Sequence, residues 1–281
     1  MSSSLFSSIL PLKSAPSDEM EKLPGYDEAT RSTPTESSSA FDGASKSPSL
    51  KYALISIAWT DRIRLLRFPE HTTERISAVL RAAWPKGIQH VKLVADHPEI
   101  KLKGNPFSYA QDDEKIAIRR CFLEIFGVLA QEGWGVHPVL AGTGRIGTFG
   151  STAEKDCIVF QRQPAQRLSW MCVSFDSSSY IHLINSPPEF GQSIIQVFGD
   201  RVEKCNRDLV SGNFEIKFRD GPWWGSLKNA VSSRLIILDV LRCLEEHGYA
   251  LCASVDLDNG SGGSVYKSSA NTWFCCRSSE L

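Results

Sequence analysis

Three glycines, Gly142, Gly144 and Gly147, match the G-x-G-x-x-G pattern of a dinucleotide-binding loop. In such a loop a helix begins directly after the glycines, so that its N-terminus meets the pyrophosphate of the cofactor. Here residues 148–155 lead instead into 157–161, an apolar run typical of a strand. We therefore interpret the glycines as a hairpin loop, and we expect no cofactor.

The histidines and acidic residues give no metal signature. Asp256, Asp258 and Asn259 look like the start of a calcium loop, but Ser261 and Lys267 stand where that loop requires Gly and Glu. Zinc sites need closely spaced His and Cys residues, and the six histidines lack such spacing. We therefore predict no bound metal. The histidines are His71, His90, His97, His137, His182 and His247.

Contiguous catalytic motifs are also missing from the sequence, which has no G-x-S-x-G elbow, no P-loop and no kinase set. The adjacent acids Asp112 and Asp113 stand where a helix is expected to begin, and the helix dipole accounts for them. We assign no catalytic residue and favour a protein that is not an enzyme. Catalytic groups that converge from distant positions stay open as an alternative.

The eight cysteines include no C-x-x-C pair, and several lie inside apolar runs. Free cysteine is commonly a small buried hydrophobe, so we expect reduced cysteines in a core. The adjacent pair Cys275 and Cys276 would point to opposite faces of a strand, which disfavours a redox role for it.

Two turns place aromatic rings between an expected strand and a long helix. They are Pro106-Phe107, after Gly104, and Pro222-Trp223-Trp224, after Gly221. Rigid aromatics at such points often anchor a partner. We name Pro106, Phe107, Pro222, Trp223 and Trp224 as candidate partner-binding residues. The alternative is that each ring fills the gap between helix and sheet.

These turns belong to an internal repeat. Segments 99–107 and 215–223 lie 116 residues apart and share four identical residues. Matches continue in the same order on both sides, at offsets of 118 residues upstream and 115 downstream. The downstream matches include Arg119 with Arg234 and Leu123 with Leu238. A copy of about 110 residues is the size of a domain, so the chain is predicted to hold two tandem domains.

Each copy is predicted to be an α+β domain with the order β-β-α-β-α-β-β. In the first copy, alternating runs at 54–59 and 62–67 predict a hairpin, and helical spacing recurs at 76–84 and from about 113 to 133. Residues 90–102 are β-rich between these helices. We expect an antiparallel-dominated sheet with both helices on one face. Pseudo-twofold packing of the copies, with a continuous sheet, is one arrangement.

The first 50 residues differ in composition, with 14 Ser and 5 Pro, and are predicted to be a disordered tail. The predicted domains are therefore 1–50, 51–165 and 166–281. The net charge of −1 argues against a general nucleic-acid binder. No apolar stretch is long enough to span a membrane, and no export signal is evident. We expect a cytoplasmic or nuclear protein.

Basic residues outnumber acidic ones between positions 62 and 120, by 12 to 7. A patch for phosphate-bearing lipid or RNA is one interpretation, and a solvated face is the favoured one. The residues concerned include Arg62, Arg64, Arg67, Lys101, Lys103, Arg119 and Arg120.

The repeated segment Glu-Ile-Lys-Leu/Phe, its Pro-aromatic turn and the helix ending in Gly-Trp/Tyr resemble a family of uncharacterised, mostly fungal proteins. The likeness continues through 255–257 and 271–274. This resemblance to an uncharacterised family implies no activity and no catalytic residue.

Our leading hypothesis is a non-enzymatic intracellular scaffold or adaptor that binds another macromolecule, most simply a protein. The first alternative is a protein that binds lipid or a small ligand between the repeats, at a membrane surface or in solution. The second is an enzyme with a site at the repeat interface.

Overall fold

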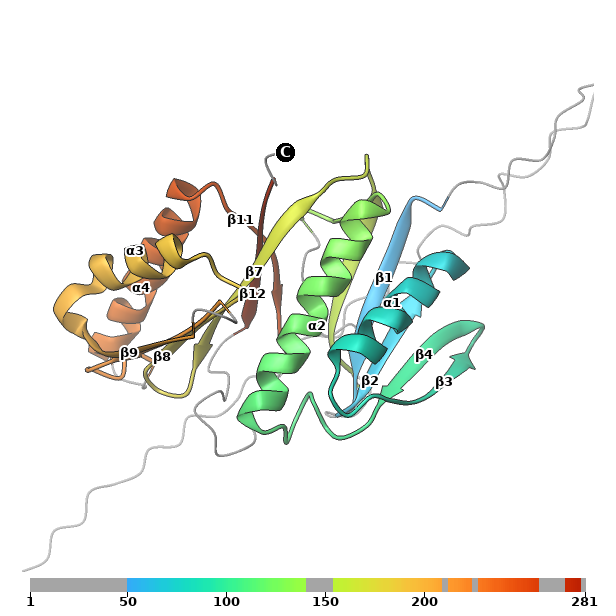
Figure 1. Ribbon diagram of the computed structural model, residues 1–281, viewed down its shortest axis with the longest axis horizontal. Coiled ribbons are helices and arrows are strands. Elements are labelled where there is room, and N and C mark those ends of the chain that lie inside the picture. Colours follow the sequence, from blue (N-terminus) through green and yellow to red (C-terminus); the bar gives the residue numbers. More distant parts are fainter. Residues whose placement is uncertain (1–49, 140–153, 209–211, 224–226, 258–270, 279–281) are drawn as a thin grey trace, which may run out of the picture. The chain divides into compact units, whose positions relative to one another are not determined.

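The computed structural model describes residues 50–139, 154–208, 212–223, 227–257 and 271–278. These residues form two separate six-stranded antiparallel sheets, each accompanied by two helices (Figure 1). This confirms the predicted tandem α+β fold. Among the described helices, none has the length and apolar character needed to cross a membrane.

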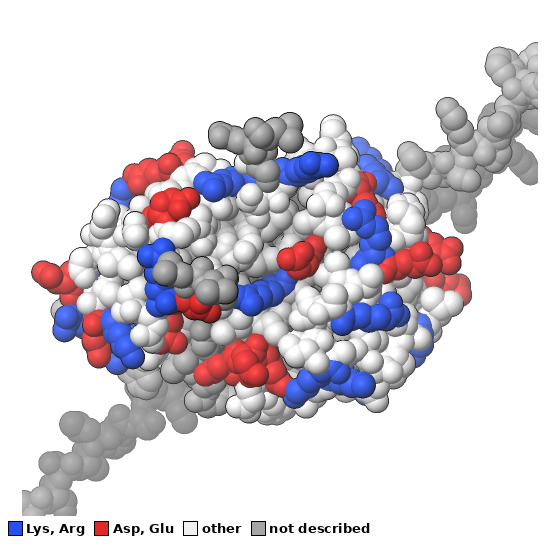
Figure 2. Space-filling model, viewed as in Figure 1, with Lys and Arg blue, Asp and Glu red and all other residues white. Residues whose placement is uncertain are grey.

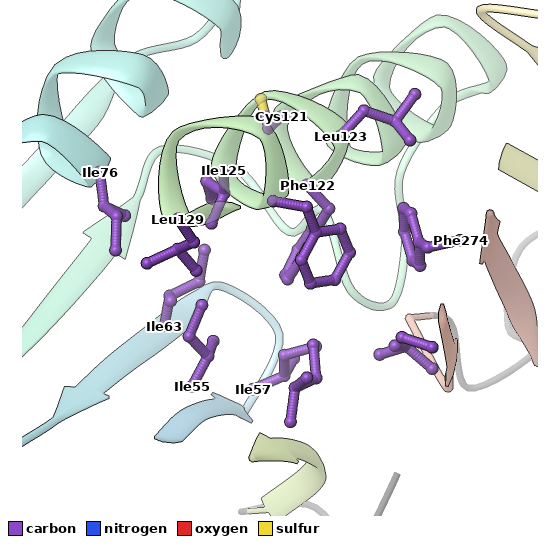
Figure 3. Packing of buried hydrophobic residues seen from close by; sticks show 14 of the residues in the cluster. Ile55, Ile57, Ile63, Ile76, Cys121, Phe122, Leu123, Ile125, Leu129 and Phe274 are labelled. Carbon is purple, nitrogen blue, oxygen red and sulfur yellow. The ribbon is translucent and has the colours of Figure 1, made fainter. Parts of the chain in front are cut away.

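The first sheet has the strand order β3-β4-β2-β1-β6-β5. Its strands are β1 (Tyr52–Ala58), β2 (Arg62–Leu66), β3 (Ile88–Val94), β4 (His97–Leu102), β5 (Trp134–Val136) and β6 (Glu154–Arg162). Its helices are α1 (Glu70–Ala83) and α2 (Asp112–Gln131). Both helices pack into one apolar cluster with the inward residues of β1 and β2, such as Ile55 and Ile63 (Figure 3).

The second sheet has the order β11-β12-β7-β8-β10-β9, which repeats the first sheet strand for strand. Its strands are β7 (Leu168–Asp176), β8 (Tyr180–Ile184), β9 (Val202–Asp208), β10 (Asn213–Phe218), β11 (Ala250–Val255) and β12 (Thr272–Ser278). Its helices are α3 (Pro188–Phe198) and α4 (Leu227–Glu246), with a 3-10 turn, η1 (Gly199–Arg201), after α3. These helices pack on β7, β8 and β10 in a second apolar cluster.

Each repeat has one strand more than the sequence predicts. The β-rich stretch 90–102 lies in two strands, β3 and β4, because Ala95 and Asp96 turn the chain with φ values of 49° and 63°. Neither residue is a strong turn signal like Gly or Pro, so the sequence conceals the reversal. The second repeat has the same pair, β9 and β10.

Helix α2 is buried on more than one side. Ile118, Phe122, Ile125 and Leu129 face the first sheet at helical spacing, as the sequence predicts. Its N-terminus is closed by a capping box between Gln111 and Glu114. Because Arg119 pairs with Asp176 and the Phe126 ring stacks on Trp170, both on β7, α2 joins the two repeats.

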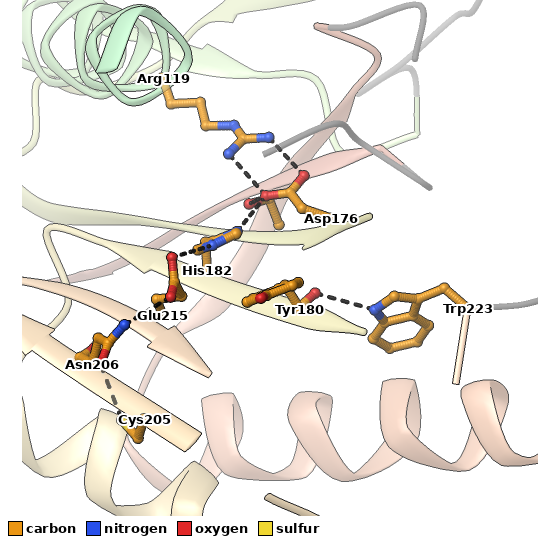
Figure 4. A network of polar contacts seen from close by, with 9 residues as sticks. Arg119, Asp176, Tyr180, His182, Cys205, Asn206, Glu215 and Trp223 are labelled. Atoms are coloured by element: carbon orange, nitrogen blue, oxygen red, sulfur yellow. Dashed lines mark hydrogen bonds and ion pairs between the residues drawn. The ribbon is translucent and has the colours of Figure 1, made fainter. Parts of the chain in front are cut away.

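Strand β7 explains how the repeats meet. Its alternate residues Met171, Val173 and Phe175 pack with α3 and α4, whereas Trp170 and Cys172 belong to the cluster around α2. The second sheet is thus covered on both faces, by α4 on one and by α2 on the other (Figure 4). The predicted continuous sheet is wrong, because the two sheets are separate and a helix lies between them.

Candidate functional sites

The Pro-aromatic turns lie where the repeats predict them, between a strand and a helix. Phe107 is fully buried with its ring 6.4 Å from that of Phe122, and Pro106 is buried beside it. The rings of Pro106 and Phe107 thus fill space between helix and sheet.

In the second repeat Pro222 is buried and Trp223 is half-buried. The Trp223 indole donates to the Tyr180 carbonyl at 3.1 Å, and Trp224 lies outside the described residues. The role of these five residues as partner anchors stays a prediction, and the sites below do not depend on it.

A buried ion pair crosses the repeat junction (Figure 4). The guanidinium of Arg119, on α2, donates two hydrogen bonds to the carboxylate of Asp176, on β7, at 2.8 and 3.0 Å. The Ser174 hydroxyl donates to the same carboxylate at 2.7 Å, and Nδ1 of His182 lies 2.7 Å from it. Glu215 extends the network, with its Oε2 3.5 Å from Nε2 of His182.

Burial alone would raise the pKa of Asp176. The charge of Arg119 and the hydrogen bond to His182 outweigh it and lower that pKa to about 2. The hydrogen bond to His182 also lowers the pKa of Glu215. The network therefore keeps both carboxylates ionised, one of them fully buried.

Ser174, His182 and Asp176 are the residue types of a hydrolase triad, but their geometry is different. In a triad the serine contacts the histidine nitrogen that does not face the aspartate. Here Ser174 donates to Asp176 itself, and the distal nitrogen of His182 faces Glu215. Because Ser174, Asp176 and His182 are also buried, the network is suited to joining the repeats.

The first repeat carries the equivalent cluster, and none of the described helices covers it. Glu99 stands in place of Glu215, and its carboxylate pairs with Arg62 at 3.1 Å, Arg64 at 2.8 Å and Lys92 at 3.3 Å. These contacts lower the pKa of Glu99 although burial opposes its ionisation. Figure 2 shows Lys and Arg interspersed with Asp and Glu on the displayed face. Of the predicted basic residues, Arg119 is buried in the ion pair.

Acid should weaken the Arg119–Asp176 pair over a defined pH window. The folded-state pKa of Asp176, about 2, lies below the ordinary value of 3.8, so its stabilising contribution is complete above about pH 4 and is lost as the pH falls towards 2. We expect the difference in unfolding free energy between the wild type and Asp176→Asn to shrink by about 2 kcal/mol across this window. Urea unfolding at stepped pH measures it, and a constant difference would contradict the assignment.

Helix α4 exposes an apolar stripe. Leu227, Val231, Leu235 and Leu238 are 92 %, 62 %, 54 % and 61 % exposed, and their spacing places them on one side of the helix with Arg234. We call these five residues the α4 face. The opposite side, with Ile236 and Val240, is buried against the second sheet. Contiguous exposed apolar residues on a soluble protein commonly mark an interaction site.

A cavity of about 640 Å³ lies where the edge strands β5 and β11 approach the end of α2. Aromatic and aliphatic side chains form most of its wall, together with two glutamines and the cysteines Cys252 and Cys276. Residues from both repeats line it: Phe126, Ala130, Trp134, Gly135, Val136, Pro138, Val139, Phe160, Gln163, Gln166, Leu168, Trp170, Leu251, Cys252, Ala253, Ser254, Asn271 and Cys276.

All eight cysteines are free, and five of them are buried, as expected for reduced core cysteines. Cys275 is buried whereas Cys276 is half-buried, which agrees with their predicted opposite directions. The notable pair is instead Cys252 on β11 with Cys276 on β12, whose thiols shift each other's pKa. The neighbouring Cys276 and burial raise the pKa of Cys252, and the neighbouring Cys252 lowers the pKa of Cys276.

Several sequence predictions fall outside the described residues, namely the glycine loop at 142–147 and Asp258 and Asn259. Among the residues that the structure describes, His, Cys, Asp and Glu nowhere form a group of three suited to hold a metal ion. Sequence reasoning missed the Asp176 network, the α4 face and the cavity. One signal was available, because the apolar run 170–175 is typical of a strand covered on both faces.

This architecture defines a class of protein, in which one six-stranded α+β domain occurs twice in tandem and the first copy's helix covers the second copy's sheet. A protein-family model matches residues 51–161 and again 169–276, so the chain belongs to that family, which is uncharacterised. The fungal distribution that the sequence resemblance implies stays a prediction. No curated protein and no solved structure matches the chain.

Proposed function

We propose that the protein is a non-enzymatic scaffold that binds another protein through the α4 face. The observation that carries this proposal is the equivalence of α4 to α2. Both helices have 20 residues, and equivalent positions lie 115 residues apart. The side of α2 that corresponds to the α4 face is the side that contacts the second sheet.

Two residue pairs show the difference in burial. Arg119 and Leu123 on α2 are 2 % and 5 % exposed, and Arg119 pairs with Asp176 on the second sheet. Their equivalents on α4, Arg234 and Leu238, are exposed. An apolar surface of this kind gains free energy when a partner removes it from water. The α4 face therefore has the residue types of an interface that the chain already uses once.

The expected occupant is the open face of a β-sheet that presents a carboxylate to Arg234, as β7 presents Asp176 to Arg119. A second copy of this chain does not meet that requirement. Ala58 stands on β1 where Asp176 stands on β7, and Arg62 and Arg64 lie close by on β2. The acid nearest to this position on the first sheet, Glu99, is buried and already paired with Arg62, Arg64 and Lys92, so it is not available to Arg234.

A cytoplasmic or nuclear location is part of the proposal. It is supported by the eight free cysteines, which suit a reducing compartment.

The test uses the full chain in its native cells, with a photo-crosslinking amino acid at Leu238. We expect a cross-link to a strand of the partner that carries Asp or Glu. Arg234→Glu should abolish the cross-link, and replacing the partner's acid with lysine should restore it, because the charges are then exchanged. The measurement is mass spectrometry of the cross-linked peptides.

The matched control places the same cross-linker at Leu93 on β3, which is also exposed and apolar but lies outside the α4 face. The proposal would be overturned by cross-links that Leu93 gives equally, or by a cross-link to a second copy of this chain. Leu238→Glu should leave the unfolding free energy within about 0.5 kcal/mol of the wild type, because the site is exposed.

A further inference from the structure

We infer that the cavity between β5 and β11 is a binding site for a small uncharged molecule that has an apolar body and a hydrogen-bond acceptor. This site is separate from the α4 face. Its volume, about 640 Å³, lies within the range of roughly 300–1,000 Å³ that is usual for small-molecule sites.

The wall selects against charged ligands. Among the described residues that line the cavity, none is Asp, Glu, Lys or Arg. A charged ligand would lose its hydration without gaining an ionic partner, and that loss is costly. Phe126 and Trp170 offer instead a stacked aromatic pair, with ring centroids 5.1 Å apart. Gln163, Gln166 and Ser254 supply the few polar groups that orient a ligand in an apolar site.

The polar side chains of this wall decide which polar group the ligand carries. The indole N–H groups of Trp134 and Trp170 have no acceptor among the described residues, but their nitrogens are closed off from water, so a ligand in the cavity does not reach them. The amide groups of Gln163 and Gln166 and the hydroxyl of Ser254 line the cavity and can donate to a carbonyl or ether oxygen. The proposed ligand therefore carries an acceptor.

The cysteines of the wall give a direct way to observe occupancy. Cys252 and Cys276 are half-buried and line the cavity, while Cys205 on β9 is half-buried outside it. The lowered pKa of Cys276 favours its thiolate, the form that reacts with alkylating reagents. A ligand in the cavity should therefore protect Cys276 and Cys252 but leave Cys205 unchanged.

The experiment titrates the full chain with Nile red, a neutral dye with an aromatic body and a carbonyl oxygen, and follows its fluorescence. Leu251 lines the cavity and is partly exposed, so Leu251→Glu places a charge in the wall without removing a buried side chain. We expect this variant to weaken binding at least tenfold. Trp170→Phe puts a smaller ring into the stacked aromatic pair with Phe126, and should weaken binding several-fold.

The controls are Leu93→Glu, on an exposed strand, and Leu238→Glu, on the α4 face; both should bind the dye like the wild type. Saturating dye should slow iodoacetamide labelling of Cys276 several-fold, with Cys205 as the internal reference. The inference would be overturned by the absence of saturable binding, by unaltered binding in Leu251→Glu, or by equal labelling of Cys276 with and without dye. Loss of binding in Leu238→Glu would also overturn it, because the dye would then occupy the α4 face.

Discussion

Asp176→Asn is expected to lower the free energy of unfolding by about 3–5 kcal/mol, which is the usual cost of removing one partner of a buried ion pair. The asparagine has nearly the same shape, so the loss comes from electrostatics rather than from packing. Arg119, which is 2 % exposed, would keep its charge opposite a neutral amide. Urea unfolding of the full chain at pH 7 measures the change.

An exposed ion pair provides the control for this variant. Asp220 pairs with Arg201 at 3.2 Å near the surface, and Asp220→Asn should cost no more than about 1 kcal/mol. A double variant, Arg119→Met with Asp176→Leu, should recover only part of the loss. It leaves no unpaired arginine, but the buried Ser174 hydroxyl and His182 Nδ1 still lose the carboxylate that they contact. Equal losses in Asp176→Asn and Asp220→Asn would show that the junction does not depend on the pair.

The sequence was sufficient to predict the fold of each repeat because the relevant signals are local. Alternation in β1 and β2 and the helical stripe of α2 each lie within a short segment, and the repeat shows every pattern twice. The missed strand in the first repeat has an equally local cause. Ala95 and Asp96 form the turn between β3 and β4 without a glycine or proline to mark it, whereas in the second repeat Gly212 precedes β10.

The packing of the repeats could not be predicted in this way. Arg119 and Arg234 are the same residue at equivalent positions of equivalent helices, yet the first is buried and the second exposed. The difference lies in what packs on each helix: β7, which carries Asp176, covers this side of α2, whereas no described strand covers the same side of α4. Neither helix sequence contains that information.

The cavity was hidden from the sequence for a related reason. Its wall combines short pieces of α2, β5, β6, β7 and β11, and no two of its aromatic residues form a recognisable motif. Its polar side chains Gln163, Gln166 and Ser254 come from both repeats and are brought together only by the fold. The expectation of a small-ligand site between the repeats named the region but not its residues.

Phe126→Ala is expected to destabilise the protein by about 3–5 kcal/mol, because its ring is in contact with both repeats. The ring centroid of Phe126 lies 6.0 Å from that of Phe160 in the first sheet and 5.0 Å from that of Phe274 in the second. Its removal would leave a void at the junction, and the side chains around a void relax only partly. Urea unfolding measures the loss.

The matched variant is Leu241→Ala, at the position of α4 equivalent to Phe126. Leu241 is only partly buried, and within the described parts of the chain no second sheet covers α4, so this truncation should cost clearly less than Phe126→Ala. The difference between the two losses combines the larger volume of the phenylalanine ring with what the covering sheet adds to the helix. Equal losses would mean that α2 gains nothing from the second sheet, and they would remove the physical basis for regarding the α4 face as an unoccupied interface.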